Sequence, residues 1–230
     1  MATLAEIRTS IQLVLQDDDY GDDLLNIMVN DALQHIAGGV LMPNGLISNP
    51  IPELYTTASV VTIAGQAYAG LPDDYQRGIF FVSDSVGDQI KPIDDHGYYD
   101  YRVWLNSMPY KDLSESCSVY RVAIKGNRFY YQGVPTTPET LTIHYYRKPD
   151  TMAAGTDEPD GLPAFLAKPL LKHYVCQDIF GEGIEDGEDS AGRGAAYHKQ
   201  KFYEYMQNLM DFLPEDEEAG YVNDLFDRIY

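Results

Sequence analysis

The clearest evidence for the fold lies in residues 118–147, SVYRVAIKGNRFYYQGVPTTPETLTIHYYR. Two runs rich in β-branched and aromatic residues, SVYRVAI and RFYYQ, are separated by Lys125, Gly126 and Asn127. Such runs favour strands, and Gly126 or Asn127 can take the positive φ that a tight turn between strands requires. The stretch therefore predicts a β-hairpin.

A further strand follows the hairpin. Residues 140–147 alternate between two sets of side chains, which predicts one buried face and one wet face. The first set is Leu141, Ile143 and Tyr145, and the second is Thr142, His144 and Tyr146. Similar runs, separated by Gly, Pro, Asn and Asp, extend back to residue 54. Strands are expected near 59–63, 78–83, 89–93, 118–124, 128–132 and 140–147.

The N-terminal residues show the periodicity of two amphipathic helices. The first helix starts with a capping box of Thr3 and Glu6, and the second is capped by Asp22 or Asp23 and ends at Gly38 and Gly39. The expected buried positions are Leu4, Ile7, Ile11, Val14 and Leu15 in the first helix, and Leu24, Leu25, Met28, Ala32, Leu33 and Ile36 in the second.

Helical periodicity returns after a linker rich in Pro, Gly and Asp at 149–163. Pro169 marks a first turn or a kink, because proline cannot donate an interior helix bond. The expected inward positions are Leu166, Leu170, Tyr174, Val175, Ile179 and Phe180, and then Ala195, Phe202, Met206, Leu209 and Leu213 in a last helix near 193–213.

Helices at both ends bury their apolar faces most economically against each other, which leaves the strands as an insertion. The sequence thus predicts an α+β protein: a helical bundle formed by N- and C-terminal helices, with an inserted antiparallel β domain. The expected parts are a discontinuous bundle of 1–50 and 156–213, a β-rich insertion of 51–155 and a C-terminal extension of 214–230.

The chain is strongly acidic. Its 36 acidic and 16 basic residues give a formal net charge of −20 at pH 7. A polyanion repels nucleic-acid phosphates, so specific DNA binding is disfavoured, although acidity also serves solubility alone. Two cysteines, no signal sequence and no long apolar run predict a soluble protein with reduced thiols and no membrane partner.

Three stretches in this order resemble the head-to-tail adaptor (connector) proteins of tailed bacteriophages, including the tail tubular type. They are GQAYAGLPDDYQRG at 65–78, KGNRFYYQGVPTTPETLTIHYYRKP at 125–149 and DGLPAFLAKPLLKHYVCQDIF at 160–180. The resemblance covers roughly residues 3–213. The excursion at 94–117 and the extension after Leu213 have no dependable counterpart in that family.

The resemblance implies a structural virion protein in the head-tail neck, assembled in the host cytoplasm. Its partners would be the portal protein, neighbouring copies in a twelve-fold ring, and a downstream tail or nozzle protein. DNA would pass through the ring's channel without specific binding. No cofactor and no enzymatic activity are implied.

The C-terminal extension, PEDEEAGYVNDLFDRIY, is amphipathic when drawn as a helix. It either folds back on its own bundle or docks on the portal or a neighbouring subunit. The candidate docking residues are Tyr221, Val222, Leu225, Phe226, Ile229 and Tyr230.

Tyrosine is unusually frequent, with 19 tyrosines against 8 phenylalanines. Tyrosine suits partly wet interfaces, although the edge of an ordinary sheet would also explain many of them. Contacts between subunits are expected at Tyr98, Tyr99, Tyr101 and Trp104, and further clustered tyrosines are Tyr110, Tyr130, Tyr131, Tyr145 and Tyr146.

Metal and catalytic sites are disfavoured. In a calcium loop that starts at Asp17, position six would be Asp22 instead of glycine and position twelve Met28 instead of glutamate, so the run 17–23 is interpreted as a solvated turn and helix cap. The acidic loop 182–189 is also interpreted as solvated. His173 and Cys176 are too few for a zinc site and are expected in a core or an interface. Familiar catalytic motifs are absent, so no residue is named for catalysis.

The main rival function is a glycan- or receptor-binding module of a phage tail fibre or spike, in which exposed tyrosines stack on sugars. A hydrolase with a dispersed acidic pair is a weaker third hypothesis.

Overall fold

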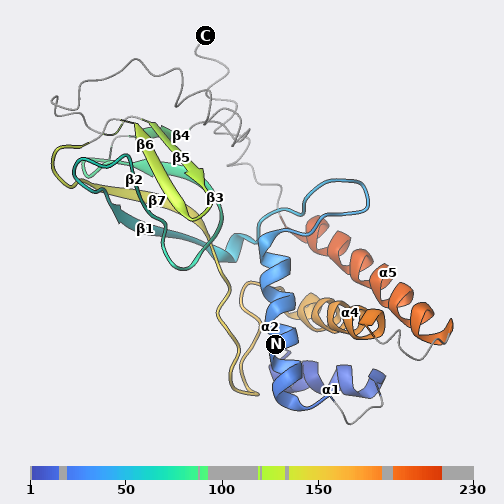
Figure 1. Cartoon of the computed structure of the whole chain (residues 1–230). Coiled ribbons are helices and arrows are strands. Elements are labelled where there is room, and N and C mark those ends of the chain that lie inside the picture. Colours follow the sequence, from blue (N-terminus) through green and yellow to red (C-terminus); the bar gives the residue numbers. More distant parts are fainter. Residues whose placement is uncertain are drawn as a thin grey trace. The chain divides into compact units, whose positions relative to one another are not determined.

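The computed structural model describes residues 2–15, 20–87, 89–92, 119, 121–132, 135–182 and 189–213. Two compact units divide these residues (Figure 1). The described residues of Met1–Leu54 and Lys148–Glu217 form a helical unit, and those of Tyr55–Arg147 form a sheet unit. The predicted α+β class is confirmed.

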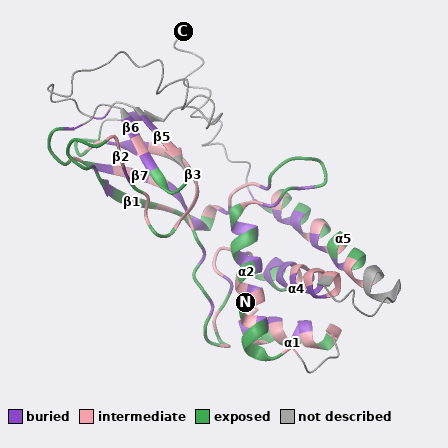
Figure 2. Ribbon diagram, viewed as in Figure 1, coloured by how far each residue is buried: buried purple, intermediate pink, exposed green. Residues whose placement is uncertain are grey.

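The helical unit is built from both ends of the chain. Its elements are α1 (Leu4–Leu15), α2 (Asp22–Gly38), the short 3-10 turn η1 (Pro52–Leu54), α4 (Ala164–Glu182) and α5 (Asp189–Phe212). α4 packs along α5, and both N-terminal helices contact α4. Figure 2 shows the buried stripes that result. Fully buried residues include Leu4, Ile7, Ile11, Leu25, Val29, Leu170, Val175, Phe202, Met206 and Leu209.

α1 begins with the predicted capping box. The Thr3 amide donates to Glu6 Oε2 (3.2 Å), and the Glu6 amide donates to Thr3 Oγ1 (3.4 Å). These two bonds satisfy amides that the first helical turn leaves without an intrahelical acceptor. Leu4, Ile7 and Ile11 are buried as expected, whereas the expected burial of Val14 and Leu15 is only partial.

The start of α2 corrects the sequence interpretation. Gly21 is the N-cap and makes no side-chain cap bond, so the prediction of Asp22 or Asp23 as cap is wrong. Both acids lie in the first turn, where a carboxylate still interacts favourably with the helix dipole. Asp22 Oδ2 lies 3.2 Å from Arg8 Nη1, so this carboxylate ties α2 to α1.

Burial along α2 also differs from the expected set. Leu24 is 44% exposed, and Val29 is buried in its place. Met28 is only partly buried. The buried stripe thus follows Leu25, Val29, Ala32, Leu33 and Ile36, a step of three or four residues that keeps one face on the core. Gly39, at φ 104°, ends the helix as predicted.

The C-terminal helices follow the predicted pattern except in the position of Pro169, the start of α5 and the only partial burial of Tyr174, Phe180 and Ala195. Pro169 lies inside α4 beyond its first turn, because the helix already begins at Ala164; the first-turn placement is therefore wrong. α5 begins at Asp189, earlier than expected. Phe202, Met206, Leu209 and Leu213 are buried as predicted, whereas Ala195 is only partly buried.

Residues 149–163 are more than the linker that their composition suggests. The amides of Leu4 and Ala5 donate to the carbonyls of Asp157 (2.8 Å) and Gly155 (3.0 Å), so this segment caps α1. Asn30 of α2 makes two bonds with Met152: its Nδ2 donates to the carbonyl (3.0 Å), and its Oδ1 accepts from the amide (2.8 Å). The segment is thus an integral part of the helical unit.

The sheet unit contains seven strands in the order β1-β7-β3-β4-β5-β6-β2. Their bounds are β1 (Tyr55–Val61), β2 (Tyr68–Gly70), β3 (Tyr75–Ser83), β4 (Gln89–Pro92), β5 (Arg121–Lys125), β6 (Arg128–Gln132) and β7 (Thr140–Arg147). All six predicted strands are present. The short β2 was not predicted from the sequence.

One pair of strands departs from the expected antiparallel arrangement. β4 and β5 are parallel, with Lys91 opposite Arg121 and Pro92 opposite Val122. Parallel neighbours need a long crossover connection, and residues 93–120, almost all outside the described part of the chain, connect these two strands. The remaining neighbours are antiparallel.

The hairpin and the last strand match the sequence prediction closely. In the hairpin, Lys125 pairs with Arg128 and Gly126 has φ 60°, so glycine takes the strained turn position. In β7, Leu141, Ile143 and Tyr145 are buried. Tyr146 is also buried, contrary to a fully wet second face.

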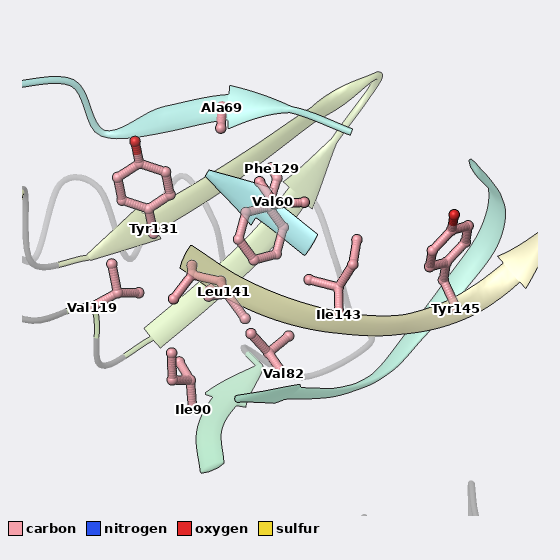
Figure 3. Packing of buried hydrophobic residues seen from close by; sticks show 11 residues of the cluster. Val60, Ala69, Val82, Ile90, Val119, Phe129, Tyr131, Leu141, Ile143 and Tyr145 are labelled. Atoms are coloured by element: carbon pink, nitrogen blue, oxygen red, sulfur yellow. The ribbon is translucent and has the colours of Figure 1, made fainter. Parts of the chain in front are cut away.

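The sheet curves around a single core (Figure 3). One cluster of buried side chains draws on all seven strands, including the edge strands β1 and β2, which a flat sheet would keep apart. Two of its largest members are tyrosines with satisfied hydroxyls. Tyr131 donates to the Tyr68 carbonyl (3.1 Å) and accepts from the Ile63 amide (3.0 Å), and Tyr145 donates to Asp74 Oδ1 (2.6 Å).

Candidate interaction surfaces

The residues predicted to dock on other subunits lie outside the described part of the chain. This holds for Tyr221, Val222, Leu225, Phe226, Ile229 and Tyr230 of the extension, and for Tyr98, Tyr99, Tyr101 and Trp104 of the excursion. It also holds for Tyr110 and for most of the two acidic runs. Their proposed roles stay predictions.

The clustered tyrosines that the structure does describe serve the core more than a surface. Tyr131 and Tyr145 are 1% exposed and Tyr146 is 5% exposed. Burial is the main cause that raises the pKa of Tyr145 far above its ordinary value, and the hydrogen bond to Asp74 adds to it. An interface role for these three tyrosines is therefore wrong, because their side chains are already buried within the chain.

An ordered loop that follows α2 presents three exposed aliphatic side chains. We name residues 40–48 the aliphatic loop; Leu41, Leu46 and Ile47 in it are 61–64% exposed. Backbone bonds hold the loop closed, from Met42 to the Leu46 carbonyl (2.8 Å) and from Ser48 to the Val40 carbonyl (2.8 Å). Exposed aliphatic side chains on an ordered backbone are typical of interaction surfaces.

The aliphatic loop is also free of charge. Residues 36–52 contain no Asp, Glu, Lys, Arg or His, although charged residues make up 23% of the whole chain. Sequence periodicity gave no signal for this surface, because its exposed positions follow neither a helical nor a strand period. The absence of charge alone would not have singled it out, because residues 54–72, which include β1 and β2, are uncharged as well.

His173 and His198 form a buried pair between α4 and α5. Their Nδ1 atoms lie 2.7 Å apart, so one ring donates a proton and the other accepts it. Phe180 stacks on His198 and Tyr205 stacks on His173. Burial, together with the neighbouring His198, lowers the pKa of His173 to about 4; burial also lowers the pKa of His198.

The partner of His173 in the core is His198, and not Cys176, which lies three residues further along α4. Cys176 is fully buried, and burial raises the pKa of its thiol to about 11. Both residues lie in the core, which was one of the two placements, core or interface, expected from the sequence. Among the described residues, no three His, Cys, Asp or Glu side chains are grouped to hold a metal ion.

Comparison with known families decides between the functional hypotheses. The family model described as SU10 adaptor protein matches residues 2–223, nearly the whole chain. The chain belongs to the SU10 adaptor protein family. A comparison with curated proteins found no match. The resemblance to phage head-to-tail adaptors is thereby confirmed, and the protein is a structural phage protein, a component of the virion.

The three stretches that carry the resemblance are placed coherently in this adaptor. Residues 65–78 run through β2 into β3, residues 125–149 run from the hairpin through β7, and residues 160–180 open α4. The three stretches thus cover the entry into β3, the hairpin with the last strand, and the start of α4. In the described part of the adaptor, every helix is too short or too polar to cross a bilayer.

Proposed function

We propose that this adaptor is one subunit of a ring, twelve-fold as the resemblance implies, that joins the portal to the tail in the phage neck. The observation that carries the proposal is the family match over residues 2–223. The ring would continue the DNA channel below the portal, and assembly would take place in the host cytoplasm.

The charge of the chain supports a channel that does not retain DNA. Each subunit carries a formal charge of −20, and the phosphates of DNA repel an acidic wall at short range. DNA would therefore slide through during packaging and ejection without specific binding. The same charge makes the copies repel one another, so their mutual contacts need surfaces that avoid like charges.

The aliphatic loop suits such contacts, and we assign it to the neighbouring copy in the ring. It is charge-free between His35 and Glu53, and its exposed Leu41, Leu46 and Ile47 would be removed from water on contact. A contact between two different patches of one chain, repeated from copy to copy, forms a ring when the rotation between neighbouring copies closes. The extension at 221–230 stays the proposed contact to the portal.

Purified adaptor mixed with the portal protein of its phage provides the test. Native mass spectrometry should give a complex with a fixed number of adaptors per portal, and electron cryo-microscopy of the neck should place the ring between portal and tail. Trimers that bind host polysaccharide, with no adaptor in the neck of mature particles, would instead support the glycan-binding module and refute the ring.

A further inference from the structure

The helical unit contains an open cleft that the ring assignment does not use. The cleft measures about 950 Å³ and is lined mainly by the segment that leads into α4, with one residue from η1 and one from the end of α5. All its lining residues belong to the helical unit. The cleft is therefore a feature of one folded unit.

Two exposed phenylalanines form the apolar side of this cleft. Phe165, in the first turn of α4, is 62% exposed, and Phe212, the last residue of α5, is 55% exposed. Their rings meet edge to face with centroids 5.2 Å apart. An aromatic pair that packs on itself yet stays this exposed offers a preformed apolar contact surface.

Carboxylates surround the aromatic pair. Five of the lining residues are acidic, and no lining residue that the structure describes is Lys, Arg or His. They are Glu53, Asp150, Asp157, Glu158 and Asp160.

Two of these carboxylates are fixed by the backbone. Asp157 Oδ2 accepts the amides of Ala153 and Ala154 (both 2.8 Å), and Asp160 Oδ2 accepts the amide of Asp150 (2.9 Å). The backbone bonds lower the pKa of Asp157, so its charge is present throughout the neutral range. The negative rim is thus held in place before any partner arrives.

We propose that this cleft binds a segment of another protein in which a long aliphatic or aromatic side chain is flanked by arginine or lysine. The apolar side chain would cover the faces of Phe165 and Phe212, and the cations would meet the rim carboxylates and the aromatic rings. A second copy of this chain is a poor occupant, because its aliphatic loop offers no cation to the rim carboxylates and the chain as a whole is predominantly acidic. The proposal does not depend on the ring.

The test uses the full-length adaptor and a short fluorescent peptide of alternating arginine and leucine, with peptides of glutamate and leucine and of glutamine and leucine as comparisons. Fluorescence anisotropy should show binding of the arginine peptide only. The variants Phe165→Ala and Phe212→Ala should each weaken binding about tenfold, whereas Leu13→Ala, at an even more exposed apolar residue outside the cleft, should change it less than about twofold.

Matched charge variants separate the cleft from the overall acidity. The pair Glu53→Gln and Glu158→Gln should weaken binding about tenfold, and the pair Asp23→Asn and Asp31→Asn, which removes two charges elsewhere in the helical unit, should leave it nearly unchanged. Equal losses in both pairs would mean that the peptide responds to net charge alone, which would overturn the proposal.

Fluorine NMR of the protein labelled with fluorophenylalanine gives a second readout on the same cleft. The resonances of Phe165 and Phe212, assigned by the two alanine variants, should move when the arginine peptide is added and stay fixed when only the protein concentration rises. Shifts with protein concentration alone would make a second copy the occupant. Peptide binding that appears only after removal of 214–230 would make the chain's own extension the occupant; either result would refute the proposal.

Discussion

The packing of α4 against α5 depends on the protonation state of the histidine pair between them. With 2.7 Å between the two Nδ1 atoms, the pair is satisfied only while at least one ring is neutral. A second proton would place two positive charges side by side in a buried site. Lys172 and Lys201 add to this repulsion, whereas Glu204 opposes it.

Stability should therefore fall on acidification through the histidine range. The unfolded chain takes up these protons near the ordinary histidine pKa of about 6.5, but folded His173 does so only near about 4. Protonation thus favours the unfolded state between these values, and the loss should reach about 2–3 kcal/mol per pair at pH 4. Urea unfolding at a series of pH values measures it.

The variant His173→Phe tests the assignment, because it removes the first site of the pair and keeps an aromatic ring against Tyr205. Its unfolding free energy should vary less between pH 6.5 and 4 than that of the parent. His35→Gln, at an exposed position on α2, serves as control. An identical pH slope in the parent and in His173→Phe would contradict the role of the pair.

At the scale of elements, the amide side chain of Asn30 joins α2 to the segment before α4. Asn30→Ala removes both bonds to Met152, which is buried, and leaves the Met152 amide and carbonyl without these partners. The variant should lose about 2–3 kcal/mol of unfolding free energy. Gln207→Ala, which removes one exposed bond to Asp211, should lose less than about 0.5 kcal/mol. Equal thermal denaturation curves for the two variants would contradict this account.

The aliphatic loop makes a second prediction at this scale. The double variant Leu46→Ser and Ile47→Ser should fold normally, because both side chains are more than 60% exposed. It should nevertheless reduce the number of adaptors bound per portal, measured by native mass spectrometry, because the apolar contact between copies is lost. Val86→Ser, 84% exposed in the sheet unit, is the matched control. A full ring formed by the double variant would remove the loop from the interface.

The elements that the sequence predicts best are those that local chemistry determines. The capping box of Thr3 and Glu6 and the turn at Gly126 each involve residues only a few positions apart. A short stretch of sequence is therefore enough to predict them. The pairing of His173 with His198 and of Asn30 with Met152 joins distant positions. No periodicity encodes such pairings, and they emerge only when the elements pack.

The docking residues expected at 98–104 and 221–230 stay predictions, because they lie outside the described residues. The sequence pointed to tyrosines, but Tyr131 and Tyr145 are enclosed because the sheet curves around them. A curved sheet leaves fewer wet positions than the alternation of a flat strand suggests, and curvature is not visible in one strand. The aromatic pair of the cleft was missed because Phe165 and Phe212 come from opposite ends of two helices.

At the scale of the whole molecule, charge opposes the association of like subunits. Ring formation on the portal should become more favourable as ionic strength rises from 0.01 to 0.15 M, because the screening length falls from about 30 to about 8 Å. The copies bound per portal at limiting adaptor concentration measure this. Assembly that weakens with added salt would indicate that ion pairs, rather than uncharged contacts, hold the copies together.

The pairing of β1 with β7 brings the two ends of the sheet unit together. Tyr55, where the chain enters the sheet unit, pairs with Tyr146, next to where it leaves. Because the chain enters and leaves the sheet unit at neighbouring points, the strands between these points can be exchanged or removed, and the helical unit then has only a short gap to close. The strands thus have the geometry of an exchangeable module, one that recombination could replace with another sequence of matching ends without redesigning the helices.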